Sequence, residues 1–175
     1  MQELVEELAA ARIGSTFNFY AQGERAPLLR ERLGEYFHAR RGARFLVVGE
    51  AAGYRGARVS GLAFTSERQL TGAGPAEASA TIVQRALDEL GATEDVLLWN
   101  LVPTHPHRPR VPGSNRPPTR AEIDAARPFL ERLARGRRVV PVGRLAQSAL
   151  GGPYVRHPSH GGAAAFRAGL AEALA

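Results

Sequence analysis

Three polar residues of different chemistry stand at the ends of short apolar runs in this sequence. Glu50 directly follows the run 45–49, Asn100 lies near the end of a second run, and His157 follows a third. A carboxylate can orient water or stabilise a cation, a carboxamide can donate and accept hydrogen bonds, and an imidazole can act as a donor or a base. Phe64 adds a flat aromatic face soon after Glu50. These residue types together favour a binding or catalytic pocket.

The chain pattern predicts the elements that would bring these residues together. Apolar, β-branched runs predict strands, and apolar residues at helical spacing predict helices between them. The expected strands are 45–49, 95–102, 139–143 and 154–156, and the expected helices are 1–12, 27–40, 77–90, 119–135, 145–150 and 163–174. Thr119 and Glu122 have the spacing of a capping box at the start of the helix 119–135. This alternation predicts an α/β fold, with three α/β/α layers and a central parallel sheet of about four strands. Because parallel strands end at one edge, the three polar residues should meet there.

Each of the four residues also has a purely structural explanation, which the sequence leaves open. His157 could cap the following helix, and Asn100 could satisfy backbone groups at the end of its strand. Phe64 could be a core aromatic. Glu50 could pair with an arginine while only its backbone lines the pocket.

The composition limits the class of protein and excludes several kinds of site. The chain has 175 residues, of which 44% are hydrophobic and 23% charged, and this is typical of one globular domain spanning 1–175. Cysteine is absent, so disulfides, thiolate metal sites and a cysteine nucleophile are excluded. No apolar run reaches the length of about 18 residues that suggests a membrane span. The acidic start of the chain does not resemble a secretory signal, so a cytoplasmic protein is expected.

The positive charge favours a nucleic acid partner. The net charge is +6 and the isoelectric point about 10.8, and all 23 basic residues are arginines. Guanidinium groups bind phosphate oxygens well. A coding bias toward arginine is the alternative explanation. Segment 103–118 contains three of these arginines, two histidines and six prolines, and an irregular stretch of this length is usually functional.

Three ordered motifs resemble the uracil-DNA glycosylase superfamily, and most closely its iron–sulfur branch, often called family 4. The first is Gly49-Glu50-Ala51-Ala52-Gly53, followed by Gly61-Leu62-Ala63-Phe64. The second is Asn100-Leu101-Val102, with Asn115-Arg116-Pro117-Pro118-Thr119 and the segment 122–128 downstream. The third is His157-Pro158-Ser159. The resemblance covers about residues 44–162.

The chain also departs from this pattern. Family 4 holds its cluster with four cysteines, and Ala126-Arg127-Pro128 stands where that family has Cys-Arg-Pro. No cofactor or metal is therefore expected. The best-known branch has a water-orienting Asp at the position of Ala51 and a Tyr that excludes the thymine methyl at the position of Gly53. That branch also inserts a leucine wedge into DNA after His-Pro-Ser, where this chain has His160-Gly161-Gly162.

The resemblance implies a role for each motif residue. His157 would donate to the departing base, and Glu50 would orient water or stabilise the cationic sugar. Asn100 and Phe64 would bind a flipped base together with the segment carrying Gly49, Ala51 and Gly53. The DNA strand would be held by Ser159, His160, Arg55, Arg108, Arg110 and Arg116. Ser66 and Glu67 are weaker candidates for phosphate contact or water handling.

The resulting hypothesis is a monofunctional DNA glycosylase that hydrolyses the N-glycosidic bond of uracil or a related deaminated base. Its partner would be DNA containing such bases, and it would act as a monomer. Two alternatives remain open: a DNA-binding relative without catalysis, and an α/β protein that binds small nucleotides. A histidine metal site is disfavoured because the histidines of segment 103–118 are flanked by prolines. A dinucleotide site is disfavoured because the glycines around Gly49 lack the required spacing.

Overall fold

Three parallel strands form the centre of the computed structural model, which describes residues 1–175. Their spatial order is β2 (Val96–Val102), β1 (Phe45–Ala51) and β3 (Arg138–Pro141). The register pairs Gly49 of β1 with Asn100 of β2. All seven residues of β2 are buried, as are the first five of β1, in keeping with a parallel sheet that is covered on both faces.

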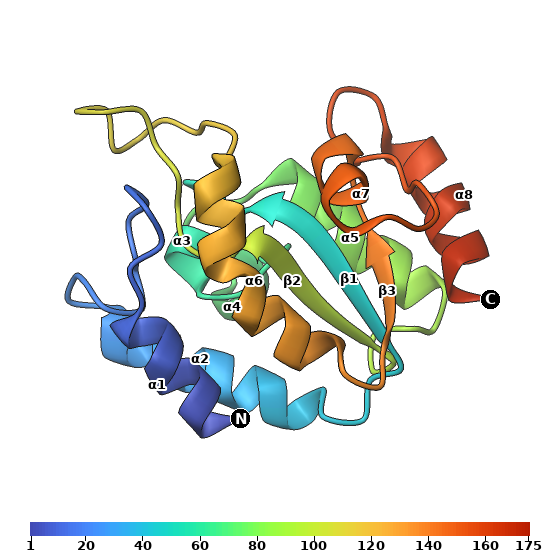
Figure 1. The fold of residues 1–175 in the computed structure, drawn as a ribbon. Coiled ribbons are helices and arrows are strands. Elements are labelled where there is room, and N and C mark those ends of the chain that lie inside the picture. The colour runs from blue at the N-terminus through green and yellow to red at the C-terminus, as the bar shows by residue number, and fades with distance from the viewer.

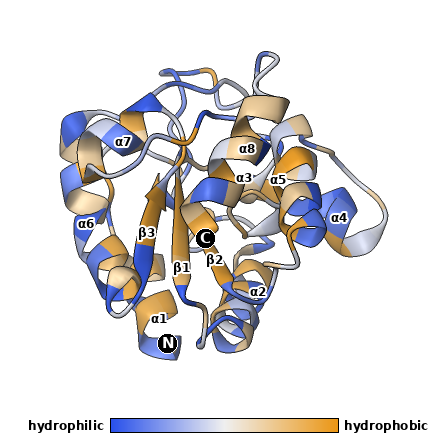
Figure 2. Cartoon of the chain, turned by 90° about the vertical axis from the view of Figure 1, so that its right-hand side faces the viewer, coloured by the Kyte–Doolittle hydropathy of each residue, from blue (hydrophilic) through white to orange (hydrophobic).

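Helices cover both faces of this sheet, as predicted (Figure 1). Leu46 and Val48 of β1 belong to one apolar cluster, and Phe45 and Val47 belong to another, because successive side chains of a strand point to opposite faces. The first cluster includes residues of α1 (Gln2–Ala10), α2 (Ala26–Ala39) and α6 (Arg120–Ala134). The second includes residues of α5 (Ala78–Glu89) and α8 (Ala163–Leu174). The apolar strands lie between these amphipathic helices (Figure 2).

Three short helices complete the fold. The helix α7 (Arg144–Leu150) follows β3 almost where the sequence predicts it. Two further helices, α3 (Ala57–Ser60) and α4 (Glu67–Thr71), lie in a segment where the sequence predicts only loops. With four and five residues, they are too short to show an apolar period. None of the helices is both long and apolar enough to cross a membrane.

The prediction of about four strands was one too many. Residues 154–156 contribute only a single parallel bridge between Val155 and Val142. Gly151 and Gly152 precede this segment with φ angles of +73° and +83°, so no strand extends back through these two residues. The bridge still places the segment beside β3, because Gly143 N donates to Val155 O at 2.8 Å.

The proline-rich segment 103–118 is anchored at several points. His105 forms an antiparallel bridge with Phe17. Thr119 caps α6 through the predicted capping box with Glu122. The Glu122 carboxylate also accepts two hydrogen bonds from the Arg116 guanidinium, at 2.6 and 2.8 Å. One buried carboxylate thus joins the end of the loop to the start of the helix.

We expect the Glu122 carboxylate to make stability depend on pH. Hydrogen bonds from Arg116 are the main cause that lowers the pKa of Glu122 from 4.5 to about 2. A carboxyl group with a depressed pKa stabilises the folded state above its ordinary pKa, and this contribution is lost as the pH falls toward about 2. Glu122→Gln should therefore lower the free energy of unfolding at pH 7 by about 2–3 kcal/mol, and the difference should shrink below pH 4.5. Denaturant unfolding across this pH range measures it; a deficit that does not change with pH would contradict this assignment.

Candidate active site

Two cavities that share five lining residues lie at the carboxyl edge of the sheet. The larger, about 870 Å³, is lined by the segment after β1, the start of α7, the proline-rich segment and the loop that carries His157. The smaller, about 60 Å³, shares Glu50, Glu77 and His157 with the larger one and extends to Phe64 and Asn100. The structure therefore brings the four residues singled out from the sequence to one cavity. Ala51 and Gly53 line both cavities.

Asn100 presents an unpaired amide to the smaller cavity. Asn100 is only 6% exposed, yet its side chain takes part in none of the protein's hydrogen bonds. This geometry contradicts the structural alternative in which the amide satisfies backbone groups at the strand end. Buried amides are normally hydrogen-bonded, so an unpaired one at a cavity is suited to a ligand that offers both a donor and an acceptor.

Phe64 is held against the strand in a backbone conformation that is uncommon for its type. Its φ is +50°, in the left-handed region. Gln84 Nε2 donates to the Phe64 carbonyl at 3.1 Å, which helps to hold this conformation. A Cβ atom on Gly49 would overlap the Phe64 ring and lie 2.8 Å from Asn100 Oδ1. Only glycine at position 49 therefore lets the ring and the amide share one cavity.

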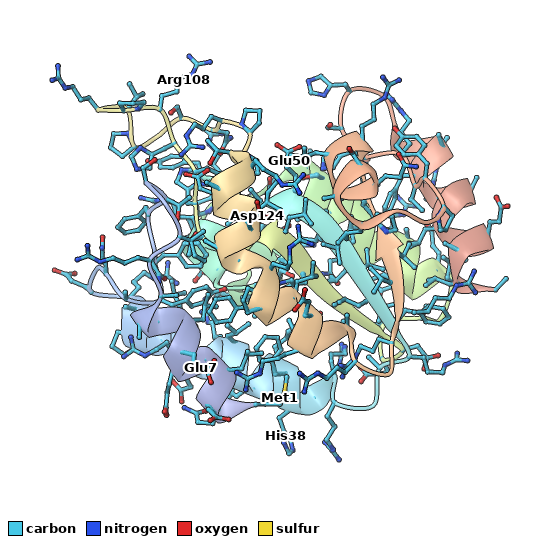
Figure 3. All side chains as sticks on the ribbon, in the orientation of Figure 1. Met1, Glu7, His38, Glu50, Arg108 and Asp124 are labelled. Carbon is cyan, nitrogen blue, oxygen red and sulfur yellow. The ribbon has the colours of Figure 1, made fainter.

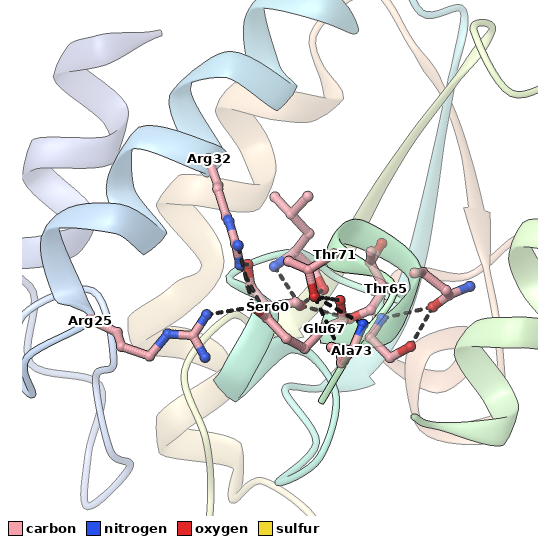
Figure 4. Close-up of polar contacts among 10 residues, drawn as sticks. Arg25, Arg32, Ser60, Thr65, Glu67, Thr71 and Ala73 are labelled. Atoms are coloured by element: carbon pink, nitrogen blue, oxygen red, sulfur yellow. Dashed lines mark hydrogen bonds and ion pairs between the residues drawn. The ribbon is translucent and has the colours of Figure 1, made fainter. Parts of the chain in front are cut away.

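A polar network fixes the segment that follows Phe64 (Figure 4). Ser60 Oγ donates to Thr65 O at 2.6 Å, and the Glu67 carboxylate pairs with Arg25 at 2.7 Å and Arg32 at 2.8 Å. Ser66 forms a capping box with Gln69 at the start of α4. Ser66 and Glu67 line neither cavity. The structure therefore gives no support to the prediction that they contact phosphate or water, and it shows them in hydrogen bonds and ion pairs within the segment that follows Phe64.

The environment of His157 selects one neutral tautomer. The backbone N–H of Ser159 points to His157 Nδ1 at 3.2 Å, and Ser159 Oγ lies 2.8 Å from the same nitrogen. A nitrogen that accepts from an N–H carries no proton of its own, so the proton of the neutral ring belongs on Nε2. Gly143 lies beside this side chain with a φ of +89°, a conformation that favours glycine, and a Cβ there would be in ordinary contact with His157 at 3.6 Å.

Two carboxylates line both cavities. Burial raises the pKa of Glu50 and of Glu77 above the ordinary value, although Ser79 partly offsets the shift of Glu77. Glu50 forms no ion pair, in contrast to the alternative that an arginine binds it. Sequence reasoning missed Glu77 because it reads as the first residue of a helix. It also missed Ser79 and Arg144, which line the smaller and the larger cavity respectively.

The arginines expected to hold DNA divide into two groups. Arg116 lines the larger cavity, but its guanidinium is paired with Glu122. Arg55, Arg108 and Arg110 are exposed, form no ion pair and line neither cavity. Arg108 projects from the tip of the proline-rich segment, at the same end of the molecule as Glu50 (Figure 3). Ser159 and His160 line the larger cavity.

The tip of the proline-rich segment is a turn held by hydrogen bonds. Arg108 and Val111 form an antiparallel bridge, with Arg110 between them at a φ of +61°. Ser114 Oγ accepts from Arg108 N at 2.9 Å and donates to Val111 O at 2.7 Å. Arg108 and Arg110 are therefore presented on a hydrogen-bonded turn.

A family model described as the uracil DNA glycosylase superfamily matches residues 36–171, which is more than half of the chain. The chain belongs to this superfamily. Its structure is similar to the crystal structure of wild-type SMUG2 from Pedobacter heparinus, with a TM-score of 0.70 and 14% sequence identity, over 99% of this chain and 96% of that one. This likeness shows a shared fold. No curated protein matches the chain significantly. Superfamily membership supports a function of the DNA glycosylase type and a DNA substrate.

We expect the His157 ring to be neutral at pH 7. Burial, then the neighbouring His160 and Arg156, lower the pKa of His157 below its ordinary value of 6.5. Nitrogen-15 NMR should place the proton on Nε2 at pH 7, with a titration midpoint below 6.5. Ser159→Ala is a matched control that should keep this tautomer, because the backbone N–H of residue 159 still donates. A proton on Nδ1, or a midpoint above 6.5, would contradict this account.

Proposed function

We propose that this chain is a monofunctional DNA glycosylase that removes uracil or a related deaminated base from DNA, as the first step of base excision repair. The observation that carries the proposal is the unpaired amide of Asn100, which lines the same cavity as His157 and Phe64. A base inside a duplex cannot reach such a cavity, so the target nucleotide must leave the helix, at a cost of about a few kcal/mol.

Recognition would use Phe64 and Asn100. The Phe64 ring offers a stacking face for the extruded base. The Asn100 amide can accept from N3–H and donate to O4 of uracil, whereas cytosine presents an amino donor in place of O4 and has no hydrogen on N3. Since the amide has no competing partner in the protein, a mismatched base would leave it buried and unpaired.

Bond cleavage would depend on charge stabilisation at both ends of the scissile bond. As the bond breaks, its electron pair moves to the base and the sugar becomes an oxocarbenium ion. The Nε2–H of neutral His157 can donate to a base oxygen as negative charge develops there. The Glu50 carboxylate, ionised above its raised pKa, can stabilise the sugar cation and orient the water whose oxygen bonds to C1′. The water proton then passes to Glu50 or solvent.

DNA would be held by phosphate contacts at the wall of the larger cavity and at exposed arginines outside it. Arg55, Arg108 and Arg110 are free of ion pairs, and Arg144 lines the cavity wall. Ser159 and His160 stand at the same wall and can contact the phosphates beside the extruded nucleotide. Each phosphate neutralised by an arginine releases counterions, so affinity should fall steeply with salt.

A second candidate function is DNA binding without base release. It is favoured by Ala51, which places no carboxylate after Glu50, and by the absence of a large apolar residue in His160-Gly161-Gly162.

The direct test is release of uracil from single- and double-stranded oligonucleotides, detected as alkali-sensitive abasic sites. The protein should produce them, and His157→Ala should lower the rate by about 10²–10⁴-fold, the range for loss of a positioned proton donor. His38→Ala is the matched control, because His38 is exposed at the opposite end of the molecule (Figure 3), and it should leave the rate unchanged.

DNA binding separates the two candidates. The variant Arg108→Ala/Arg110→Ala should bind oligonucleotides more weakly and with a smaller salt dependence than the protein itself. Arg135→Ala/Arg138→Ala removes the same charge from the amino edge of the sheet and should change neither. Salt-sensitive binding with no abasic sites for any deaminated base would favour the second candidate. If His157→Ala still binds DNA and cleaves at the unchanged rate, the proposed mechanism is contradicted.

A further inference from the structure

A carboxylate at the start of helix α5 lines the smaller cavity. Glu77 is the N-cap residue of α5, and its carbonyl accepts from Thr81 N at 3.1 Å, which ties its backbone to the first turn of the helix. Its side chain forms no ion pair and lines both cavities. None of the motifs that place the chain in its superfamily contains this residue.

Two glycines make room for this carboxylate. A Cβ atom on Gly53 would lie 2.9 Å from Glu77 Oε1, and one on Gly56 would overlap Oε2. The Glu77 carboxylate therefore occupies the space that side chains at positions 53 and 56 would otherwise take. The segment after β1 is glycine-rich here because a residue from a distant part of the chain completes that wall.

The remaining walls of the smaller cavity limit which edge of a base Glu77 can meet. In the proposed function, Phe64 covers one face of a pyrimidine, Asn100 pairs with the N3–O4 edge, and His157 reaches the oxygen beside the glycosidic bond. The edge of the base that these three residues do not engage is C5–C6. Among the other residues that line the smaller cavity, Glu77 has the charged side chain that is not yet given a role, and its carboxylate lies against Gly53.

We propose that Glu77 is a specificity-determining residue that reads the C5 substituent of the bound pyrimidine. This inference rests on the proposed function. A hydrogen at C5, as in uracil, leaves the carboxylate its access to water. A methyl at C5, as in thymine, would crowd a charged group and remove its hydration without offering a donor. A hydroxymethyl at C5 can donate a hydrogen bond to the carboxylate, so 5-hydroxymethyluracil belongs to the accepted class.

The test compares uracil, thymine and 5-hydroxymethyluracil in one oligonucleotide context. Glu77→Ala should raise the ratio of kcat/KM for thymine to that for uracil by at least about tenfold, the range for one methyl group in a shaped pocket. It should also lower the preference for 5-hydroxymethyluracil over thymine. Glu77→Gln keeps the size and an acceptor oxygen but removes the charge, so it should retain the preference for 5-hydroxymethyluracil over thymine and lose part of the discrimination between thymine and uracil. Glu172→Ala removes an exposed, unpaired carboxylate elsewhere on the chain and serves as the matched control.

Binding provides a readout that does not need cleavage. Oligonucleotides with 2′-fluoroarabino nucleotides resist hydrolysis, so the ratio of Kd values for thymine and uracil can be measured by fluorescence anisotropy in every variant. A ratio that Glu77→Ala leaves unchanged overturns this inference, whether or not the protein releases uracil. Equal losses of kcat for all three bases in Glu77→Ala, with the selectivity intact, would overturn it too, because Glu77 would then act in the chemical step. Absence of base release by the unmodified protein would instead contradict the proposed function.

Discussion

The geometry of the candidate site depends on the lack of a side chain at Gly49. The register of the sheet sets Gly49 beside Asn100, and the Phe64 ring lies where a Cβ of residue 49 would be. Any other residue there would separate the ring from the amide. A single backbone position thus decides whether an aromatic face and an unpaired carboxamide can meet, and the support around Phe64 serves to hold that contact.

The charged groups that line the smaller cavity are acidic, although the molecule as a whole is basic. The chain is strongly basic, yet the smaller cavity is lined by two carboxylates and by a histidine whose pKa is lowered. A neutral imidazole donates through Nε2 without an initial charge, while a carboxylate beside it favours a developing cation. The arginines that remain free of ion pairs include those at the exposed turn of the proline-rich segment, away from the cavities. In the proposed function, attraction of the DNA polyanion and stabilisation of the sugar cation would therefore take place on separate surfaces.

The sequence predicted the layered fold and the meeting of Glu50, Asn100, Phe64 and His157, because strand ends and their order along the chain determine what reaches one edge of a parallel sheet. It also predicted the Thr119 capping box, which is a local pattern. It failed where tertiary contacts decide. Glu77 enters the site from α5 through space left by two glycines, Arg116 is committed to Glu122, and Glu67 to Arg25 and Arg32. No local spacing reveals such partners, and none shows that the segment 154–156 would pair with its neighbour through a single bridge.

The most direct measurement is a crystal structure of the protein with an oligonucleotide that carries a hydrolysis-resistant 2′-fluoroarabino-uridine. The account predicts that the uracil ring lies in the smaller cavity, stacked on Phe64, with its N3–O4 edge hydrogen-bonded to the Asn100 amide and a base oxygen within reach of His157 Nε2. A complex in which the nucleotide stays in the helix, or binds with the Asn100 amide still unpaired, would contradict it.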